Sequence, residues 1–286
     1  MQVLPFRTLP AGTAIGLAGL TVASLERSAT FYEGTLGMDR LDGSAGTVLY
    51  GVAGAPLLEL VERPGAQPKP AGATGLFHVA ILLPSRRDLG RLLRRILAVD
   101  YPIDGAADHL VSEAVYLADP DGNGLELYCD RPPGSWRWED NQVRMASNPF
   151  DFEGILGEGE SGPVWSGIAR ETRIGHVHLQ VGDVDEARRF YVDTIGFDLT
   201  ARWPGAVFAS ADGYHHHLGL NSWRSKGGPR PPANAAGLRY FTIELPDDDA
   251  RRALASRLEE AGVAVVHEGG ALLFGDPWGN GIVVRG

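Results

Sequence analysis

One glutamate, Glu126, stands in the middle of a short apolar strand, where a carboxylate is costly unless a positive group faces it. Residues 116–128 read YLADPDGNGLELY, and the central DPDGNG holds the Pro, Asn and Gly residues that a tight reversal needs. A hairpin folded about Asp121 sets Tyr116 opposite Glu126, with Cβ atoms about 5 Å apart on one face. The leucines beside Glu126 then point into a core. A solvent-facing glutamate is the plain alternative, so the choice depends on the partners that the rest of the chain offers.

Histidine is the residue type that could supply such a partner. The chain has eight histidines, and most of them fall at matching places of predicted strands: His78, His109, His176, His178, His215, His216 and His217. A single histidine in a strand is more often a structural residue held by hydrogen bonds. Two histidines and one carboxylate, however, form a set that binds a divalent metal on one face and leaves coordination positions open.

The elements that must position these residues come in repeats. Residues 20–38 match residues 179–197, residues 74–84 match residues 236–246, and DPDGNGLEL from Asp119 matches DPWGNGIVV from Asp276. The three offsets are 159, 162 and 157 residues. Several motifs repeated in the same order at nearly the same spacing, near 160 residues, indicate duplicated domains.

Each half divides again into two modules of one strand, one helix and three strands, which predicts an α+β fold of four βαβββ modules. The N-terminal domain spans residues 1–130, with modules 16–61 and 74–128. The C-terminal domain spans residues 172–286, with modules 173–222 and 237–284. Residues 131–171 are rich in Pro, Gly and acidic residues and are predicted as a linker with some strand or turn character.

Local signals place the elements of the first half. A helix is predicted over residues 25–36, with Ser24 as its N-cap and Gly37 as its stop, and another over residues 86–99. Strands are predicted over residues 47–50, 56–61 and 76–83 and around residues 109–111. The run YHHHLGLN, which carries His215, His216 and His217, is assigned to the last strand of the third module.

Composition narrows the class of protein. The chain has 286 residues, 44% of them hydrophobic and 22% charged, as in a globular protein. A formal net charge of −10 argues against nucleic acid or an anionic membrane as the main partner. The single cysteine, Cys129, excludes an intrachain disulfide and a thiolate-rich metal site. With no apolar run of about 20 residues and no signal-peptide pattern, we expect a cytoplasmic protein that acts on small molecules.

The motifs carry a family resemblance. FYEGTLGM, DPDGNGLELY and GHVHLQV resemble the vicinal-oxygen-chelate superfamily, which comprises glyoxalases, bleomycin resistance proteins and extradiol dioxygenases. TGLFHVAILLP, DHLVSEAVYLADPDGNGLELY and GYHHHLGLN are more specifically similar to its bacterial catechol 2,3-dioxygenase subgroup. The resemblance covers both halves and weakens in the linker. It implies that the modules pair into cupped mixed sheets around a metal, with helices outside.

The resemblance also implies roles for single residues. The extradiol members of the family take one metal-binding His from the first strand of one module, and a second His and a Glu from the first and last strands of its partner. His176, His78 and Glu126 stand at those three kinds of position.

The remaining family roles fall on three further residues. The acid–base His lies within the run YHHHLGL, where His216 fits best and either neighbour remains open, because a bulge would exchange the faces. The catalytic Tyr precedes the metal-binding Glu by ten residues and is Tyr116, in agreement with the hairpin pairing. A further substrate-binding His precedes that Tyr, and His109 is the candidate.

One departure from the family pattern leads to a prediction about architecture. The repeat offsets put Leu17 where His176 would recur, Tyr240 where His78 would recur and Val283 where Glu126 would recur. Pairing of sequence neighbours therefore gives no complete site. We predict that modules two and three pair across the linker into a single metal-bearing cup, and that modules one and four pair into a cup without a site.

Three functions from different classes follow. The first is extradiol, O₂-dependent cleavage of a catechol-type or hydroquinone-type aromatic diol, with Fe(II) as the expected ion and Mn(II) as the alternative. The second is a glyoxalase-like, metal-dependent isomerase or lyase. That chemistry resembles a site with two carboxylate or amide ligands, whereas this chain offers a single Glu and several His. The third is a binding or resistance protein without turnover. The sequence leaves the aromatic substrate and the oligomeric state open, a homodimer included.

Overall fold

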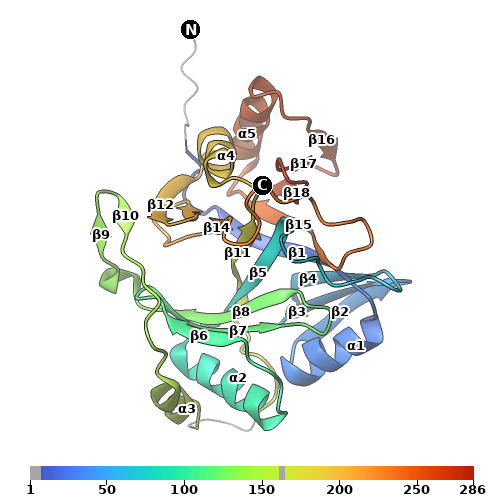
Figure 1. Ribbon diagram of the computed structural model, residues 1–286, viewed down its shortest axis with the longest axis vertical. Coiled ribbons are helices and arrows are strands. Elements are labelled where there is room, and N and C mark those ends of the chain that lie inside the picture. Colours follow the sequence, from blue (N-terminus) through green and yellow to red (C-terminus); the bar gives the residue numbers. More distant parts are fainter. Residues whose placement is uncertain (1–7, 161–164) are drawn as a thin grey trace.

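The computed structural model describes residues 8–160 and 165–286. Two mixed sheets of eight strands each form the scaffold, with the longer helices on their outer sides (Figure 1). The predicted α+β class is confirmed. No helix in the described residues is long and apolar enough to cross a bilayer.

The first half of the chain supplies two of the modules. Module one consists of β1 (Ala14–Val22), α1 (Leu25–Ala29), η1 (Thr30–Thr35), β2 (Asp39–Ser44), β3 (Thr47–Val52) and β4 (Ala55–Glu62). Module two consists of β5 (Gly75–Leu82), α2 (Arg86–Ala98), β6 (Gly105–Asp108), β7 (Ser112–Ala118) and β8 (Gly124–Asp130). Both follow the predicted order of one strand, a helix and three strands.

The second half repeats the pattern. Module three consists of β11 (Arg173–Gln180), α4 (Val184–Arg188), η3 (Arg189–Ile195), β12 (Asp198–Trp203), β13 (Ala206–Ser210) and β14 (Leu218–Asn221). Module four consists of β15 (Gly237–Glu244), α5 (Asp248–Glu260), β16 (Val266–Glu268), β17 (Ala271–Gly275) and β18 (Gly281–Arg285). Between the halves lie η2 (Pro133–Ser135), β9 (Trp138–Glu139), β10 (Gln142–Val143) and α3 (Phe152–Glu160).

The pairing of modules follows the prediction. One sheet has the order β12-β13-β14-β11-β5-β8-β7-β6 and so combines modules three and two. The other has the order β16-β17-β18-β15-β1-β4-β3-β2 and combines modules four and one. In each sheet the first strands of the two modules join antiparallel, β5 with β11 and β1 with β15. The prediction that modules pair across the linker is therefore confirmed.

Hydrogen bonds between the recurring motifs tie the two sheets together. The Asp119 carboxylate of the DPDGN turn accepts the Tyr32 hydroxyl at 3.0 Å, although Asp119 belongs to module two and Tyr32 to module one, whose strands lie in different sheets. In the second half Asp276 accepts the Tyr191 hydroxyl in the same way at 2.9 Å. Each aspartate also accepts backbone N–H groups of its own turn, which fixes the reversal. These motifs therefore stabilise the fold and do not supply candidate catalytic residues.

Several local predictions need correction. The helix predicted over residues 25–36 has Ser24 as its N-cap, as expected, and the Ser24 hydroxyl accepts the Arg27 N–H. After Ala29, however, it continues as the π-helix η1. The strand β2 was not predicted. The residues around His109 form a turn between β6 and β7, with Leu110 at a φ of 69°. His215, His216 and His217 precede β14 and do not form part of it.

Candidate active site

Three neighbouring strands place the small side chain of Ala80 between those of His176 and Glu126. Across β11, β5 and β8, His176 pairs with Ala80 and Ala80 pairs with Glu126. His78 lies two residues before Ala80 on β5, so it shares the same face. Because Ala80 is only a methyl group, the space between the imidazole and the carboxylate stays open. The row of three strands thus creates room for an ion.

The three candidate ligands converge in that space. Nε2 of His78 lies 2.8 Å from Oε2 of Glu126, and Nε2 of His176 lies 3.0 Å from the same oxygen. One donor atom from each residue falls within 4.8 Å of the others, and all three side chains are buried. Within residues 8–160 and 165–286, His78, Glu126 and His176 are the group whose ligand atoms lie close enough together to hold a metal ion.

The hydrogen bonding of this group favours a cation over a simple ion pair. His78 Nε2 is close to the Glu126 carboxylate but makes no hydrogen bond with it, and it has no other partner. A buried nitrogen without a partner is costly, and a metal that accepts its lone pair removes that cost. The residues therefore fit a divalent ion.

Burial sets the protonation that such an ion requires. Desolvation lowers the pKa of His176 to about 4, although the Glu126 charge opposes it. Burial alone would raise the pKa of Glu126, but the facing His176 and His78 hold it well below its usual range. A neutral imidazole and an ionised carboxylate are the forms that bind metals, so neither has to lose a proton at neutral pH.

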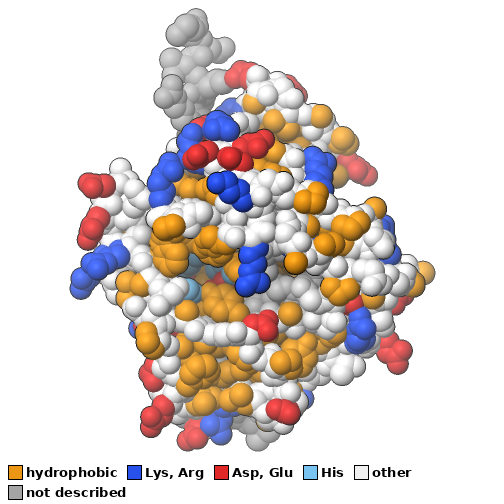
Figure 2. Space-filling view, viewed as in Figure 1, with side chains coloured by type: hydrophobic (Ala, Val, Ile, Leu, Met, Phe, Trp, Pro, Cys, Tyr) orange, Lys and Arg blue, Asp and Glu red, His pale blue; other side chains and the backbone are white. Residues whose placement is uncertain are grey.

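A cavity opens in front of this group. It has a volume of about 350 Å³, and it is formed by strands of modules two and three and by the segment before α3. Figure 2 shows histidine side chains inside a hollow of this face, surrounded by hydrophobic side chains. The apolar part of the wall consists of Phe77, Ala107, Leu117, Leu125, Met145, Trp203, Phe208 and Trp223. No lysine or arginine is among the described residues that line it.

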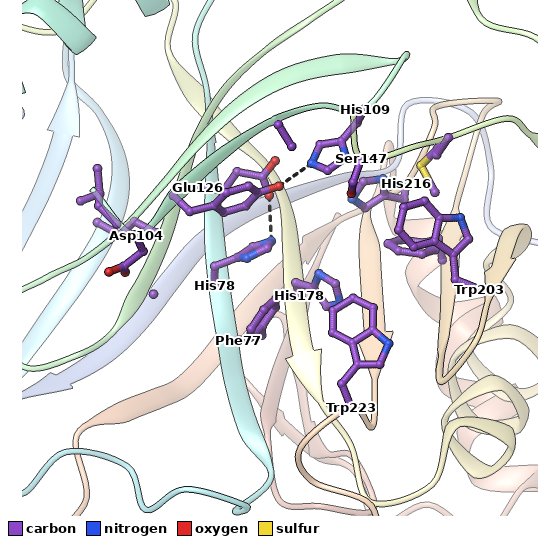
Figure 3. Close-up of a pocket in the computed structure, with 17 residues that line it drawn as sticks. Phe77, His78, Asp104, His109, Glu126, Ser147, His178, Trp203, His216 and Trp223 are labelled. Atoms are coloured by element: carbon purple, nitrogen blue, oxygen red, sulfur yellow. Dashed lines mark hydrogen bonds and ion pairs between the residues drawn. The ribbon is translucent and has the colours of Figure 1, made fainter. Parts of the chain in front are cut away.

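Tyr116 and His109 form a hydrogen-bonded pair on the cavity wall. Figure 3 shows His109 on the same side of the pocket as Glu126. Tyr116 pairs with Glu126 and Ala118 with Gly124, which is the register that the turn predicted. His109 Nδ1 donates to the Ala146 carbonyl at 2.7 Å, so its Nε2 is free to accept the Tyr116 hydroxyl at 2.6 Å. Burial and the nearby Glu126 charge raise the pKa of Tyr116 well above 10. Tyr116 is thus a protonated phenol held in a fixed orientation.

The structure separates the three consecutive histidines. His216 lines the cavity, and its ring centroid lies 4.1 Å from that of His176. His215 is fully buried behind it. His217 points away from the cavity and accepts the Ala211 N–H at 3.2 Å. Burial, followed by the neighbouring His176 and His215, lowers the pKa of His216 well below 6.5, so its imidazole is neutral.

Some residues of the cavity were not assigned a role from the sequence. His178 lies on the cavity wall, and its Nε2 accepts the Asn221 side-chain N–H at 3.0 Å. Its place two residues after His176, on the same strand face, was the signal that could have found it. Met145 and Ser147 come from the predicted linker, where no periodic pattern points to the cavity.

Comparisons with known proteins agree with this geometry. A sequence model of the family described as Glyoxalase/Bleomycin resistance protein/Dioxygenase superfamily matches residues 14–127 and 173–284. The chain is 42% identical over 272 residues to a protein of Bacillus subtilis (strain 168) named catechol-2,3-dioxygenase, with 93% of this chain and 94% of the relative covered.

Solved structures share the fold at low sequence identity. A candidate dioxygenase from Bacillus subtilis subsp. subtilis str. 168 superposes with a TM-score of 0.69 at 16% identity, covering 95% of this chain and 84% of that one. Glyoxalase I from Zea mays superposes with a TM-score of 0.58 at 18% identity, covering 96% and 92%. With a family match in both halves and a relative of 42% identity over almost the whole length, the chain belongs to the glyoxalase/bleomycin resistance protein/dioxygenase superfamily.

Proposed function

We propose that the chain is an extradiol dioxygenase that cleaves a catechol-type aromatic ring with O₂ at a ferrous ion held by His78, Glu126 and His176. The observation that carries the proposal is the convergence of these three buried side chains, two of which, His78 and Glu126, line an apolar cavity. Two imidazoles and one carboxylate leave coordination positions open for a diol and O₂. The 42% identity to a protein named catechol-2,3-dioxygenase supports the same reaction class.

The metal supplies one part of the chemistry. A ferrous ion bound by these ligands would act as a template and a Lewis acid that holds the diol and O₂ side by side. Mn(II) is the alternative ion, because imidazole and carboxylate donors suit it as well.

The chain's own residues supply the proton handling. His216, neutral and on the cavity wall, accepts a proton from a diol hydroxyl and can return it later in the reaction. Tyr116 donates its only hydroxyl hydrogen to His109 Nε2, so its phenol oxygen can hold a diol hydroxyl by accepting that hydroxyl's hydrogen, while His109 fixes the direction of the phenol. The proposal thus gives each polar group of the inner wall a separate task.

The cavity favours a particular class of diol. Its volume of about 350 Å³ exceeds what one ring needs, and Trp203, Phe208 and Trp223 line it. Because no lysine or arginine is among the described lining residues, a carboxylate on the ring would meet no counter-charge. We therefore expect an uncharged diol with an apolar alkyl or aryl substituent as the substrate. We further propose that the enzyme is cytoplasmic.

Anaerobic purification, iron quantitation and oxygen uptake test the proposal. The iron-loaded protein should consume one O₂ per diol and give a yellow ring-cleavage product with alkyl- or aryl-substituted catechols, and little with carboxylated catechols. Turnover of a substrate without oxygen uptake, in a nickel or zinc form, would support a glyoxalase-like isomerase instead. Tight binding of diols to iron-loaded protein with neither turnover nor oxygen uptake would support a binding protein.

A further inference from the structure

A chain of hydrogen bonds runs from the cavity wall to an aspartate behind it. Nδ1 of His216 lies 2.8 Å from Nδ1 of His215, and Nε2 of His215 lies 2.8 Å from Oδ1 of Asp130. Asp130 ends β8, four residues after Glu126 and on the same face of the strand. One strand therefore carries both the candidate metal-binding carboxylate and the end of this chain of contacts.

The direction of each hydrogen bond in the chain follows from its end. A carboxylate only accepts hydrogen bonds, so the hydrogen between Asp130 and His215 belongs to His215 Nε2. In a neutral imidazole the other nitrogen then carries a lone pair, which makes His215 Nδ1 an acceptor. The hydrogen between the two imidazoles must consequently belong to His216 Nδ1.

The remaining nitrogen of His216 is then left without a hydrogen. Nε2 of His216 has no hydrogen-bond partner in the described part of the chain, while the His216 ring forms part of the cavity wall. A neutral histidine with its hydrogen on Nδ1 presents a lone pair at Nε2. This form can accept a proton from a ligand hydroxyl, whereas the opposite tautomer could only donate.

The surroundings keep the chain of contacts in place. His215 is fully buried, with its ring centroid 4.1 Å from that of Tyr214 and 5.1 Å from that of Trp136. Tyr214 donates its hydroxyl hydrogen to Asp130 at 3.0 Å and accepts that of Tyr128 at 2.7 Å. Each hydrogen bond of this network is thus donated in the direction of the Asp130 carboxylate. His215 therefore has no alternative ring orientation or tautomer that keeps the same hydrogen bonds.

We infer that Asp130 and His215 are positioning residues that hold His216 in the tautomer with a bare Nε2 toward the cavity. The catalytic part of this inference rests on the proposed function, but the tautomer does not. In the proton transfer, the O–H bond of a diol breaks, an N–H bond forms at His216 Nε2, and the diol oxygen keeps the electron pair. The resulting imidazolium still donates from Nδ1 to His215, and the Asp130 charge lies one imidazole away.

The tautomer can be measured directly, without turnover. We suggest ¹⁵N NMR of histidine-labelled full-length protein loaded with Zn(II), a diamagnetic ion, with His215→Asn and His216→Asn used to assign the signals. We expect His216 to carry its hydrogen on Nδ1 and His215 to carry its hydrogen on Nε2. A His216 signal with the hydrogen on Nε2, or a doubly protonated His215, would overturn the inference.

Variants then test the positioning role in the iron-loaded enzyme. Asp130→Asn and His215→Leu should keep iron and KM within about twofold while kcat falls about 10²- to 10⁴-fold, the range for loss of a general base or its correct tautomer. His215→Asn, whose amide oxygen can accept from His216 Nδ1, should restore much of kcat. His217→Asn is the matched control, because His217 lies off the cavity, and it should retain kcat.

The outcomes separate this inference from the proposed function. If no diol is cleaved but the NMR gives the expected tautomers, the reaction assignment fails and the positioning inference stands. If wild-type protein cleaves diols while Asp130→Asn and His215→Leu keep kcat and remain folded, the inference fails and the reaction stands. A variant that loses its iron or no longer unfolds cooperatively is not used to judge the positioning role. The tautomers measured by NMR in the wild-type protein then decide whether the inference holds.

Discussion

Glu126 combines two properties that rarely occur together in one side chain. It is buried, and no lysine or arginine forms an ion pair with it in the described structure; its partners are the imidazoles of His78 and His176. Both imidazoles approach the same oxygen, so the carboxylate gathers two imidazole nitrogens around one point. Such an arrangement suits a metal-binding site better than a salt bridge, because a bound cation would interact favourably with the carboxylate and with both imidazole nitrogens.

The first prediction concerns these ligands. Glu126→Ala, His78→Ala and His176→Ala should each lower metal affinity by more than the roughly 10- to 100-fold typical of outer partners, because each removes a direct ligand. Metal analysis after dialysis against a weak chelator measures the loss. His178→Ala is the matched control, since its Nε2 is already bonded to Asn221, and it should keep the metal. Stoichiometric metal in any of the three ligand variants would refute the ligand set.

The second prediction concerns the proton acceptor. His216→Ala should keep its metal and lose about 10²- to 10⁴-fold in kcat, since general acid–base groups typically supply that much. Steady-state oxygen uptake, corrected for iron content, measures the effect. Because the structure puts His217 outside the cavity, His217→Ala should lose far less. The reverse order of the two losses would assign the role to His217.

The third prediction concerns acid stability. Burial, followed by the neighbouring His215 and His176, lowers the pKa of His217 to about 3. Between the ordinary histidine pKa of about 6.5 and pH 3, the unfolded chain binds a proton that the folded chain excludes, so stability falls as pH falls. His217→Gln should therefore reduce the slope of unfolding free energy against pH by up to about 1.4 kcal/mol per pH unit below pH 6.

Urea unfolding of metal-free protein at several pH values from 7 to 4 measures this slope. The value at pH 7 serves as the internal reference, since there the histidine is mostly neutral in both states and contributes little pH dependence. An unchanged slope in the variant would mean that His217 is charged in the folded protein, against the burial argument.

At the level of elements, the sequence predicted best what depends on neighbouring residues. The DPDGNG turn fixed which residues of β7 and β8 face each other, and the structure confirms that Tyr116 pairs with Glu126. The cap at Ser24 is equally local and is confirmed. The run of three histidines could not be placed, because it forms no strand and its faces depend on packing against Asp130 and Tyr214.

The helix α3 escaped prediction for a physical reason. Its sequence FEGILGEGE contains three glycines, each of which costs about 1 kcal/mol of helix propensity. The structure requires small residues there, since a Cβ on Gly159 would lie 2.4 Å from the Gly90 carbon of α2. Figure 1 shows the two helices side by side outside the sheet. Close packing between the helices thus overrides local propensity, and a sequence pattern does not reveal it.

The fourth prediction tests the row of strands that leaves room for the ion. Ala80 is fully buried between His176 and Glu126, so Ala80→Val should place two methyl groups where the metal would lie. We expect a large loss of metal affinity together with the roughly 1–3 kcal/mol of overpacking strain. Ala80→Gly, which keeps the space, should retain metal and lose only about 0.5–1 kcal/mol. Metal titration and urea unfolding separate the two effects, and normal metal binding by a folded Ala80→Val protein would contradict the argument.

At the level of the whole molecule, neither half of the chain contains a complete sheet. Each sheet is joined at its centre by strands from both halves, β1 with β15 and β5 with β11. One continuous cluster of buried apolar side chains includes residues of all four modules, such as Leu20, Leu89, Tyr191 and Phe241. The loss of candidate ligands from one whole cup was readable in the sequence, because ligands remain only in modules two and three.

The last prediction follows from this shared construction. A fragment of residues 1–160 contains His78 and Glu126, and a fragment of residues 165–286 contains His176, so the ligand set is complete only when both are present. Each fragment alone also leaves the central edges of two half-sheets unpaired, and such edges promote aggregation. We expect each fragment alone to be insoluble or to lack bound metal, and the two expressed together to form a 1:1 complex with one metal.

Co-purification through a tag on one fragment, gel filtration and metal analysis measure the assembly. The control pairs the first fragment with a second fragment that carries His176→Ala: the complex should form as before but hold no metal, which separates assembly from ligation. Stoichiometric metal on residues 1–160 alone, or a cooperative unfolding transition of that fragment as a monomer, would show that the N-terminal half is independent of its partner. Because every candidate ligand pair in the cup spans or adjoins the β5–β11 junction, we expect metal binding and the joining of the halves to strengthen each other.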